Sequence, residues 1–360
     1  MSGIYVHIPF CKSRCKYCDF FSTTHLEKQT QYTEAVLNEW SDRRKELMGG
    51  IQTIYIGGGT PSTMSVELLR RIIGAIKPDT QDAEIEVTIE ANPGDITLEK
   101  ARAWRALGIN RLSIGIQSFN DHLLQLIGRR HSSSEAIQAV KDAQAAGFDN
   151  ISIDLMYALP DQTMAMWQDD IAQALALGVQ HISSYGLIYE EGTVLTTLLE
   201  HGIIEAVDEE IEIQMYDYLV EELTANGFLH YEVSSFALQN RHSMHNSNYW
   251  NDTPYIGLGA GAHSYDGQQR QWNISDLDIY IERALAHDLQ PEIETLTPEQ
   301  QHTERIMLGL RTCQGVPKEM INISKALPYL QQGLLRENGN NILATTQGYH
   351  ILNRIIEDLI

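Results

Sequence analysis

The sequence has no uninterrupted apolar run near the roughly 18 residues that a membrane-spanning helix needs, and this excludes such a helix. The first residues enter a strand-like pattern directly, without a basic segment followed by an apolar stretch, so the features of a secretory signal are also missing. We therefore expect a cytoplasmic protein, a compartment in which thiols stay reduced.

Basic residues are also scarce. The chain has 26 Lys and Arg against 48 Asp and Glu, which gives a formal net charge of −22. Binding to nucleic acid draws on Lys and Arg that neutralise phosphates. The charge balance therefore argues against nucleic acid as a partner and favours a small substrate or another protein.

Cysteine is rare as well, and its distribution is uneven. Of four cysteines, Cys11, Cys15 and Cys18 lie together and only Cys313 lies elsewhere. Thiolates suit iron–sulfur clusters, zinc or copper(I), and the C-x3-C-x2-C spacing can bind three irons of a [4Fe–4S] cluster while leaving the fourth open. The alternative is a structural zinc site, which needs four closed ligands and would take His7 or His25 as its fourth.

Strand-like and amphipathic segments alternate along the first half of the chain. Six such repeats with short turns predict a parallel sheet with helices outside it. Six are too few for a full eight-stranded barrel, so we expect an open, partial barrel whose site lies at the carboxyl ends of its strands. The predicted strands are 4–8, 53–56, 84–90, 111–117, 151–156 and 181–187, and the predicted helices between them are 31–47, 65–76, 98–107, 133–146 and 166–177.

Candidate site residues fall at these strand ends, one strand after another. The cysteine loop follows the first strand, and a glycine-rich turn over 57–61 follows the second, where missing side chains let backbone approach a ligand closely. Glu90, Gln117 and Asp154 come at the ends of the next three strands. A carboxylate here would suit ribose hydroxyls or a cationic sulfonium, although either carboxylate alone would more often serve as a cap or an ion-pair partner.

The runs HIPFCKSRCKYCDF, IYIGGGTPS, IEANPGD, RLSIGIQSF and DLMYALPDQT resemble the radical S-adenosylmethionine (SAM) superfamily. Within it, essentially the whole chain resembles oxygen-independent coproporphyrinogen III oxidase and the related HemW-type heme chaperones. The resemblance implies a partial (β/α)6 barrel in which the three cysteines hold a [4Fe–4S] cluster. It further implies two sets of SAM-site residues: Tyr5, Gly58, Gly59, Thr60 and Glu90 around the cluster-bound SAM, and Tyr17, Gln117, Arg129 and Asp154 at positions that surround a second SAM in the oxidase.

Two departures from the oxidase favour the heme chaperones. The oxidase motif continues to a fourth cysteine, where this chain has Phe20, and only ten residues precede Cys11. The resemblance therefore implies a carrier that binds heme and delivers it to acceptor hemoproteins, such as membrane-bound respiratory proteins reached at the membrane surface. The cluster and SAM would stabilise it, support a homodimer or trigger heme release. The alternative is an enzyme, the oxidase itself, which decarboxylates propionate side chains of coproporphyrinogen III.

A second motif points to heme. The run from His245 through Tyr249 and Trp250 matches the H-N-x-x-Y-W signature of the chaperones. An imidazole is a good axial ligand for heme iron, and the two aromatic side chains could offer flat apolar surface to a porphyrin. Without the resemblance, a histidine beside aromatic residues is more often packed structure. His242 and His263 are rival ligands.

The rest of the chain predicts an α+β region. We divide the sequence into a barrel over 1–190, a barrel extension with the heme-binding region over 191–295, and a winged-helix-like module over 296–360. A helix is expected over 208–226; the module should hold helices over 298–310, 327–332 and 346–360, with a hairpin around Gly339. The module has six basic against six acidic residues from 297 onward, so we expect a lid or docking role and a buried Cys313.

Overall fold

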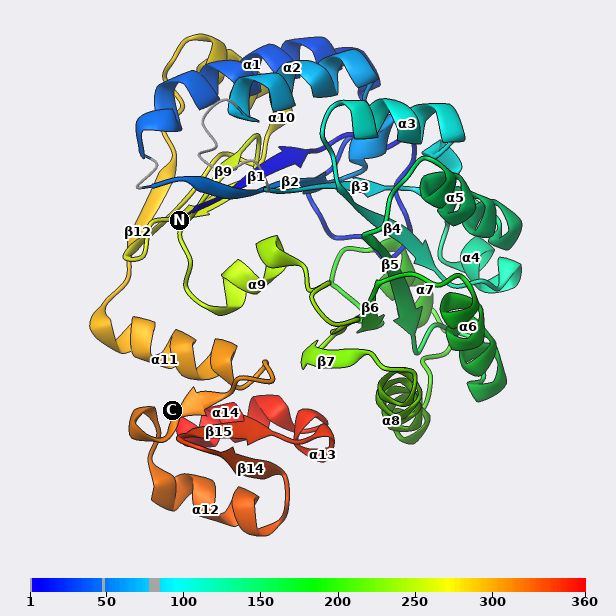
Figure 1. Ribbon diagram of the computed structural model, residues 1–360, viewed down its shortest axis with the longest axis vertical. Coiled ribbons are helices and arrows are strands. Elements are labelled where there is room, and N and C mark those ends of the chain that lie inside the picture. Colours follow the sequence, from blue (N-terminus) through cyan, green and yellow to red (C-terminus); the bar gives the residue numbers. More distant parts are fainter. Residues whose placement is uncertain (1, 47–48, 78–84) are drawn as a thin grey trace.

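The computed structural model describes residues 2–46, 49–77 and 85–360 (Figure 1). Six parallel strands alternate with helices along the first half of the chain, as predicted, and pair in sequence order. The first residue of the predicted strand 84–90 lies outside the described residues. These strands are β1 (Ser2–Ile8), β2 (Ile51–Gly58), β3 (Glu86–Ala91), β4 (Arg111–Gln117), β5 (Ile151–Tyr157) and β6 (His181–Gly186).

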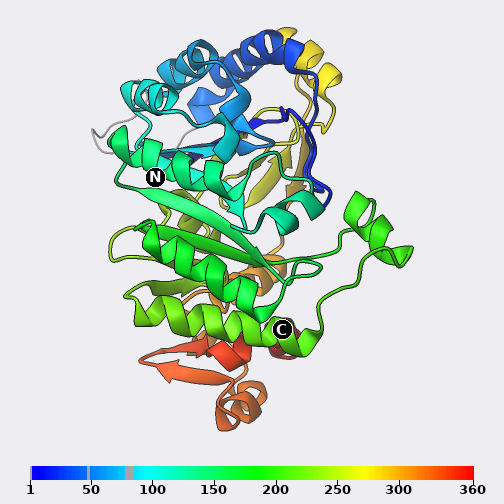
Figure 2. The ribbon, with the colours of Figure 1, turned by 90° about the vertical axis from the view of Figure 1, so that its right-hand side faces the viewer.

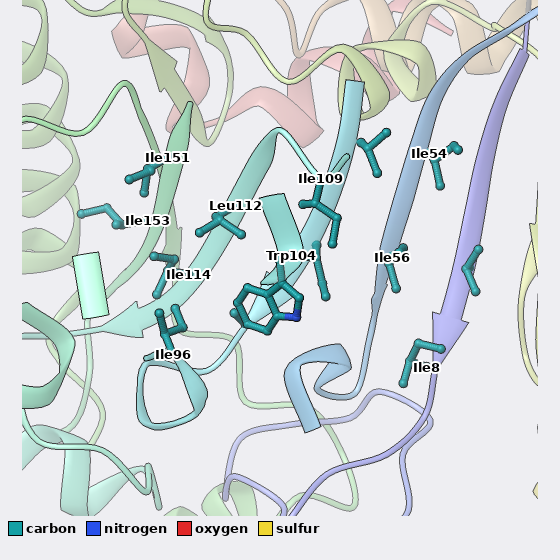
Figure 3. Close-up of a cluster of buried hydrophobic side chains, with 14 of the residues drawn as sticks. Ile8, Ile54, Ile56, Ile96, Trp104, Ile109, Leu112, Ile114, Ile151 and Ile153 are labelled. Carbon is teal, nitrogen blue, oxygen red and sulfur yellow. The ribbon is translucent and has the colours of Figure 1, made fainter. Parts of the chain in front are cut away.

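The helices pack on the outer face of this sheet because each strand turns alternate apolar side chains outward. Ile54, Ile56, Leu112 and Ile114 are fully buried there, against Trp104 and its neighbours on the helices (Figure 3). The residue at 47, where the first predicted helix was expected to end, lies outside the described residues. The helices are α1 (Gln29–Arg43), α2 (Val66–Ile76), α3 (Leu98–Ala106), α4 (Asp121–Leu126), α5 (Ser133–Ala145) and α6 (Met164–Ala176).

The inner face of the same strands is polar. On β4, Arg111, Ser113 and Gln117 alternate with the outward isoleucines and leucine, and β5 turns Ser152 and Asp154 to the same side. Period-two alternation of side chains along a strand produces this separation. The barrel interior is therefore lined with side chains that can hydrogen-bond, and these become the site.

Residues 187–295 continue the same sheet rather than starting another. β9 adds to the outer edge of β1 in parallel, and antiparallel strands extend both edges, giving twelve strands within the described residues. α7 lies on an arm that projects to one side (Figure 2), and its Leu195 packs in a buried cluster with Ile127 and Met156. The elements are α7 (Val194–Glu200), α8 (Glu209–Ala225), β7 (Leu229–Glu232), β8 (Ser235–Ala237), α9 (Met244–Trp250), β9 (Tyr255–Leu258), β10 (His263–Tyr265), β11 (Gln269–Trp272), α10 (Leu277–Leu285) and β12 (Glu292–Thr295).

The C-terminal residues form a small α+β module with its own apolar core, which includes Leu310, Ile342 and Ile355. A three-stranded sheet with a hairpin turning at Gly339 packs against the helices. Its elements are α11 (Pro298–Gly309), β13 (Val316–Pro317), α12 (Ile323–Gln331), β14 (Leu335–Asn338), β15 (Asn341–Ala344), α13 (Thr346–Tyr349) and α14 (Leu352–Leu359).

Three expectations for this module were wrong. The single last helix is two, α13 and α14, separated at His350 and Ile351. α12 begins earlier than predicted, at an Asn322 cap, and accommodates Pro328 in its interior. Cys313 is exposed rather than buried. Among the described residues, no helix is long and apolar enough to cross a membrane.

Candidate functional site

A pocket of about 430 Å³ opens at the carboxyl ends of the parallel strands. Eleven of the fifteen predicted site residues line it, and they come from every strand end from β1 to β5. They are Cys11, Cys15, Tyr17, Cys18, Gly58, Gly59, Thr60, Glu90, Gln117, Arg129 and Asp154. The predicted convergence of separate motifs on one pocket is thus present in the folded chain.

The cysteine loop is held by contacts to its neighbours. The Cys11 Sγ lies 3.3 Å from the Thr60 Oγ1, and the Arg129 Nη1 donates to the Cys15 Sγ at 3.4 Å. The backbone of Lys16 bonds to Ile127 on one side and to Leu195 of the arm on the other. All three thiols are free, and burial raises the pKa of Cys11 and Cys18. Bound iron would reverse that tendency because a coordinating thiol is deprotonated.

This donor set fits a cluster better than a single zinc ion. Among the described residues, no three His, Cys, Asp or Glu side chains are grouped closely enough to hold one metal ion. His7 cannot complete a zinc site, since its ring nitrogens contact the Tyr5 hydroxyl and the Phe21 carbonyl, and His25 pairs with Glu27. A cluster binds each cysteine through a different iron, so it tolerates thiols that stand apart and open onto a shared pocket.

The glycine turn after β2 brings backbone against the cysteine loop. A Cβ on Gly59 would lie 3.0 Å from the Cys11 Sγ and 2.9 Å from the Pro9 carbonyl, so a side chain does not fit. Gly58 has a φ of +111°, and a Cβ there would lie 2.7 Å from the His7 ring. Glycine at these positions therefore keeps the floor of the pocket beside the cysteines open.

Glu90 and Asp154 face the same pocket from β3 and β5. The Glu90 carboxylate accepts hydrogen bonds from the Tyr55 hydroxyl at 2.8 Å and from the Gly58 N–H at 3.0 Å. Ser113 donates to Asp154 at 3.3 Å. Burial raises the pKa of Glu90 to about 7 and that of Asp154 to about 6. Buried carboxyl groups are costly to ionise in an empty pocket. A cationic ligand would stabilise their charged form, so the two side chains are suited to bind one.

Arg129 and Arg130 both line the pocket but contact different partners. Arg129 reaches the Cys15 thiol and the Gly115 carbonyl, whereas Arg130 pairs with Asp95 at 3.1 Å. Arg129 is therefore the arginine that contacts the cysteine loop, and its role in SAM binding stays a prediction. Gln117 ends β4 beside a register irregularity and has a φ of 74°, a conformation costly for a residue with a side chain. Such strain is common where a side chain is aimed into a site.

Four predicted residues lie outside the pocket: Tyr5, His245, Tyr249 and Trp250. Tyr5 lies lower in the barrel, where its hydroxyl contacts the His7 ring and its own ring stacks near Tyr55. Tyr5 thus contacts neighbours of the pocket without lining it, and its contact with SAM stays a prediction.

His245 is buried at the opposite end of the barrel, with 1% of its surface exposed. Its Nδ1 lies 2.7 Å from the Thr53 Oγ1 and its Nε2 lies 2.9 Å from the Tyr249 hydroxyl, so both ring nitrogens have partners. The backbone N–H groups of Met244 and His245 donate to Glu86, and burial lowers the pKa of His245 to about 3. Heme ligation by His245 stays a prediction, and it requires α9 to leave the barrel base.

The rival histidines are more accessible. His263 is exposed on β10, and its ring stacks on Trp272 at a centroid distance of 5.7 Å. His242 is half-buried as a residue, but its Nε2 is itself buried and has no hydrogen-bond partner among the described residues. Trp250 is partly exposed, so it remains available as apolar surface.

Sequence reasoning missed several residues that line the pocket. Ser113 lies four residues before Gln117 on the same face of β4, Met156 lies two residues after Asp154, and Tyr185 lies near the end of the next strand. Strand alternation could have identified them. Phe20, noted only as a departure from the oxidase motif, also lines the pocket and is 66% exposed.

Comparison with known proteins places this geometry in context. The model of the Radical SAM superfamily matches residues 5–174. The chain is 36% identical to "Heme chaperone HemW" of Lactococcus lactis, covering 99% of this chain and 96% of the relative. It is 35% identical to the Bacillus subtilis protein of the same name, covering 99% and 98%.

A solved structure shares the fold. Coproporphyrinogen III oxidase (HemN) from Escherichia coli superimposes with a TM-score of 0.84 at 21% identity, covering 99% of this chain and 89% of that chain. A mitochondrial relative in Bos taurus, "Radical S-adenosyl methionine domain-containing protein 1", is 32% identical over 94% of this chain and 74% of its own length.

Proposed function

Since this chain belongs to the HemW family of radical SAM proteins, we propose that it is a heme chaperone that binds heme and transfers it to acceptor hemoproteins. The observation that carries the proposal is the similarity to proteins named heme chaperones across nearly the whole of both chains. The similarity includes the C-terminal module, so it does not rest on the cluster motif alone.

The pocket residues support the binding of a [4Fe–4S] cluster and SAM. Cys11, Cys15 and Cys18 would hold three irons, with Thr60 beside Cys11 and Arg129 beside Cys15. Glu90 and Asp154 would receive the positively charged parts of SAM. When bound, a cluster of this type supplies one-electron chemistry, while the protein binds and orients SAM.

The coproporphyrinogen oxidase is the second candidate, because the three cysteines and all the predicted SAM residues except Tyr5 line one pocket. Phe20 weighs against it. This exposed aromatic ring stands at the pocket where the oxidase motif has its fourth cysteine. An apolar ring at this place suits contact with a flat apolar ligand better than metal binding.

The heme ligand is proposed to be His245, exposed by outward movement of α9. Tyr249 offers a direct test, because its hydroxyl is hydrogen-bonded to the His245 Nε2, the nitrogen that would bind iron. Tyr249→Phe removes this competitor without emptying the space, so it should bind heme at least as tightly as wild type. His245→Ala should lose binding. If both variants bind as wild type does, His242→Ala and His263→Ala identify the rival ligand.

The function itself is tested in one anaerobic preparation with a reconstituted cluster. Heme-loaded protein is mixed with an apo-cytochrome, and transfer is followed by the acceptor's absorbance. A parallel sample receives SAM, a strong reductant and coproporphyrinogen III. Heme transfer without porphyrin product supports the chaperone, whereas protoporphyrinogen formed over many turnovers would make the protein an oxidase.

Two finer features belong to the same proposal. We infer that the acceptors include membrane-bound respiratory proteins, which the chain would meet from the cytoplasm at the membrane surface. We also infer a homodimer that the cluster and SAM stabilise. Sedimentation with and without the reconstituted cluster tests the homodimer, and co-sedimentation of heme-loaded protein with vesicles tests the membrane contact.

A further inference from the structure

Arg111 is a buried cation that forms no direct ion pair within the part of the chain that the structure describes. It begins β4, is 1% exposed, and turns the same way as Ser113 and Gln117, so its guanidinium lies inside the barrel. Its Nε and Nη1 have no hydrogen-bond partner, and no ion pair to it occurs among the described residues. Buried polar groups are nearly always paired, so this exception needs an explanation.

The strand register puts this charge beneath the SAM site. Arg111 pairs with Thr88, and two residues further along β4, Ser113 pairs with Glu90 and donates to Asp154 at 3.3 Å. Two residues along a strand span roughly 6.6 Å. Arg111 therefore lies two residues below the level of Glu90 and four below that of Asp154, which pairs with Gly115, on the side away from the pocket mouth.

We propose that Arg111 is a positioning residue for the SAM site, whose buried charge keeps Glu90 and Asp154 ionised for a cationic ligand. This inference rests on the proposed binding of SAM. No other buried cation among the described residues faces both carboxylates: Arg129 faces Asp154 and bonds to Cys15 and Gly115, and Arg43 lies outside the barrel, paired with Glu39.

The electrostatics of the carboxylates support the role. Burial raises the pKa of Glu90 and Asp154, and the positive charge of Arg111 opposes this rise in both. Without that charge, the pKa of each carboxyl group would be higher, so both would stay protonated up to a higher pH. A neutral carboxyl attracts a cation far less than a carboxylate does. The other titratable groups facing these three side chains are Tyr5, Tyr55, Glu86, Arg129, His181, Tyr185, Tyr231, His245 and Tyr249.

Arg111→Gln separates this role from simple structural support. SAM affinity of the reconstituted protein is measured by equilibrium dialysis between pH 5.5 and 9. Loss of the charge should move the midpoint of the pH dependence up by about one unit, so that affinity falls about tenfold near pH 6. Near pH 9 it should equal or exceed the wild-type value, because repulsion of the cationic ligand is also gone. A uniform loss at every pH would overturn the proposal.

Two variants act as controls. Arg111→Lys keeps the charge, and since the guanidinium forms no bidentate bond, the wild-type midpoint should return. Arg43→Gln also removes a buried arginine, so it should lower stability but leave the midpoint unchanged. Arg111→Met replaces Arg111→Gln if the latter does not fold.

A second measurement needs neither cluster nor SAM. Infrared difference spectra of the apoprotein follow the protonated-carboxyl band as pH rises, with Glu90→Gln and Asp154→Asn assigning the signal. In Arg111→Gln the band should persist to higher pH than in wild type, and coincident titrations would refute the role. If wild-type protein fails to bind SAM at any pH while the carboxyl band does shift in Arg111→Gln, the proposed SAM binding fails, and only the effect of Arg111 on the ionisation of the two carboxylates stands.

Discussion

Glu90→Gln should stabilise the protein in the absence of cluster and SAM. The folded protein raises the pKa of Glu90 from 4.5 to about 7, chiefly by burial. Because the folded state binds this proton more tightly than the unfolded state, the associated stability is fully present below pH 4.5. It is lost as pH rises through about 7.

Above pH 7, the ionised Glu90 therefore lowers the free energy of unfolding by about 3 kcal/mol at most, relative to the protonated form. Glutamine removes the ionisable group but can accept only one of the two hydrogen bonds from Tyr55 and Gly58, which costs about 1 kcal/mol. The net expectation is about 2 kcal/mol of added stability at pH 8, shrinking steadily between pH 7 and pH 5.

Urea unfolding of the apoprotein at several pH values measures the difference. Glu99→Gln, which removes an exposed carboxylate from the start of α3, is the matched control and should change stability little at any pH. Equal stability of Glu90→Gln and wild type at pH 8, or a gain that does not vary with pH, would refute the electrostatic reasoning.

Three further substitutions follow from close contacts and burial. Gly59→Ala should abolish cluster loading, measured as iron per chain, because its Cβ would lie 3.0 Å from the Cys11 sulfur; an unchanged iron content would contradict the packing. Gly3→Ala should lower the melting temperature, because a Cβ there would lie 3.1 Å from the His245 ring. An unchanged melting temperature would mean that α9 can shift away from β1 at little cost. Ile355→Ala should cost about 3 kcal/mol of stability in the C-terminal module, yet leave the iron content of the barrel unchanged, since its core is separate.

Strands and pocket residues were predictable because local pattern determines them. Alternation fixed which side of β4 faces inward, and parallel connections bring all carboxyl ends to one edge. Gln117 and Asp154 therefore reached the pocket without any knowledge of long-range contacts.

Other features depend on contacts that no local pattern encodes. α9 is a short polar segment that is held in place by Glu86 and Thr53, which are far away in sequence. From the sequence alone, His245 could therefore be a heme ligand as easily as a buried structural residue. The pairing of β9 with β1 likewise has no nearby signal. Arg111 begins a strand as an ordinary polar residue would, and only the folded barrel shows that its Nε and Nη1 are buried without hydrogen-bond partners.

The position of β1 between β2 and β9 also governs the order in which the protein can mature on the ribosome. β1 carries the start of the cysteine loop, but its second neighbour, Tyr255–Leu258, is synthesised only after most of the chain has emerged. A nascent chain therefore exposes an unpaired edge directly beside the thiols. We expect the cysteine loop to become ordered enough to bind iron only after β9 has paired with β1. Cluster insertion would therefore occur late, when most of the chain has been synthesised.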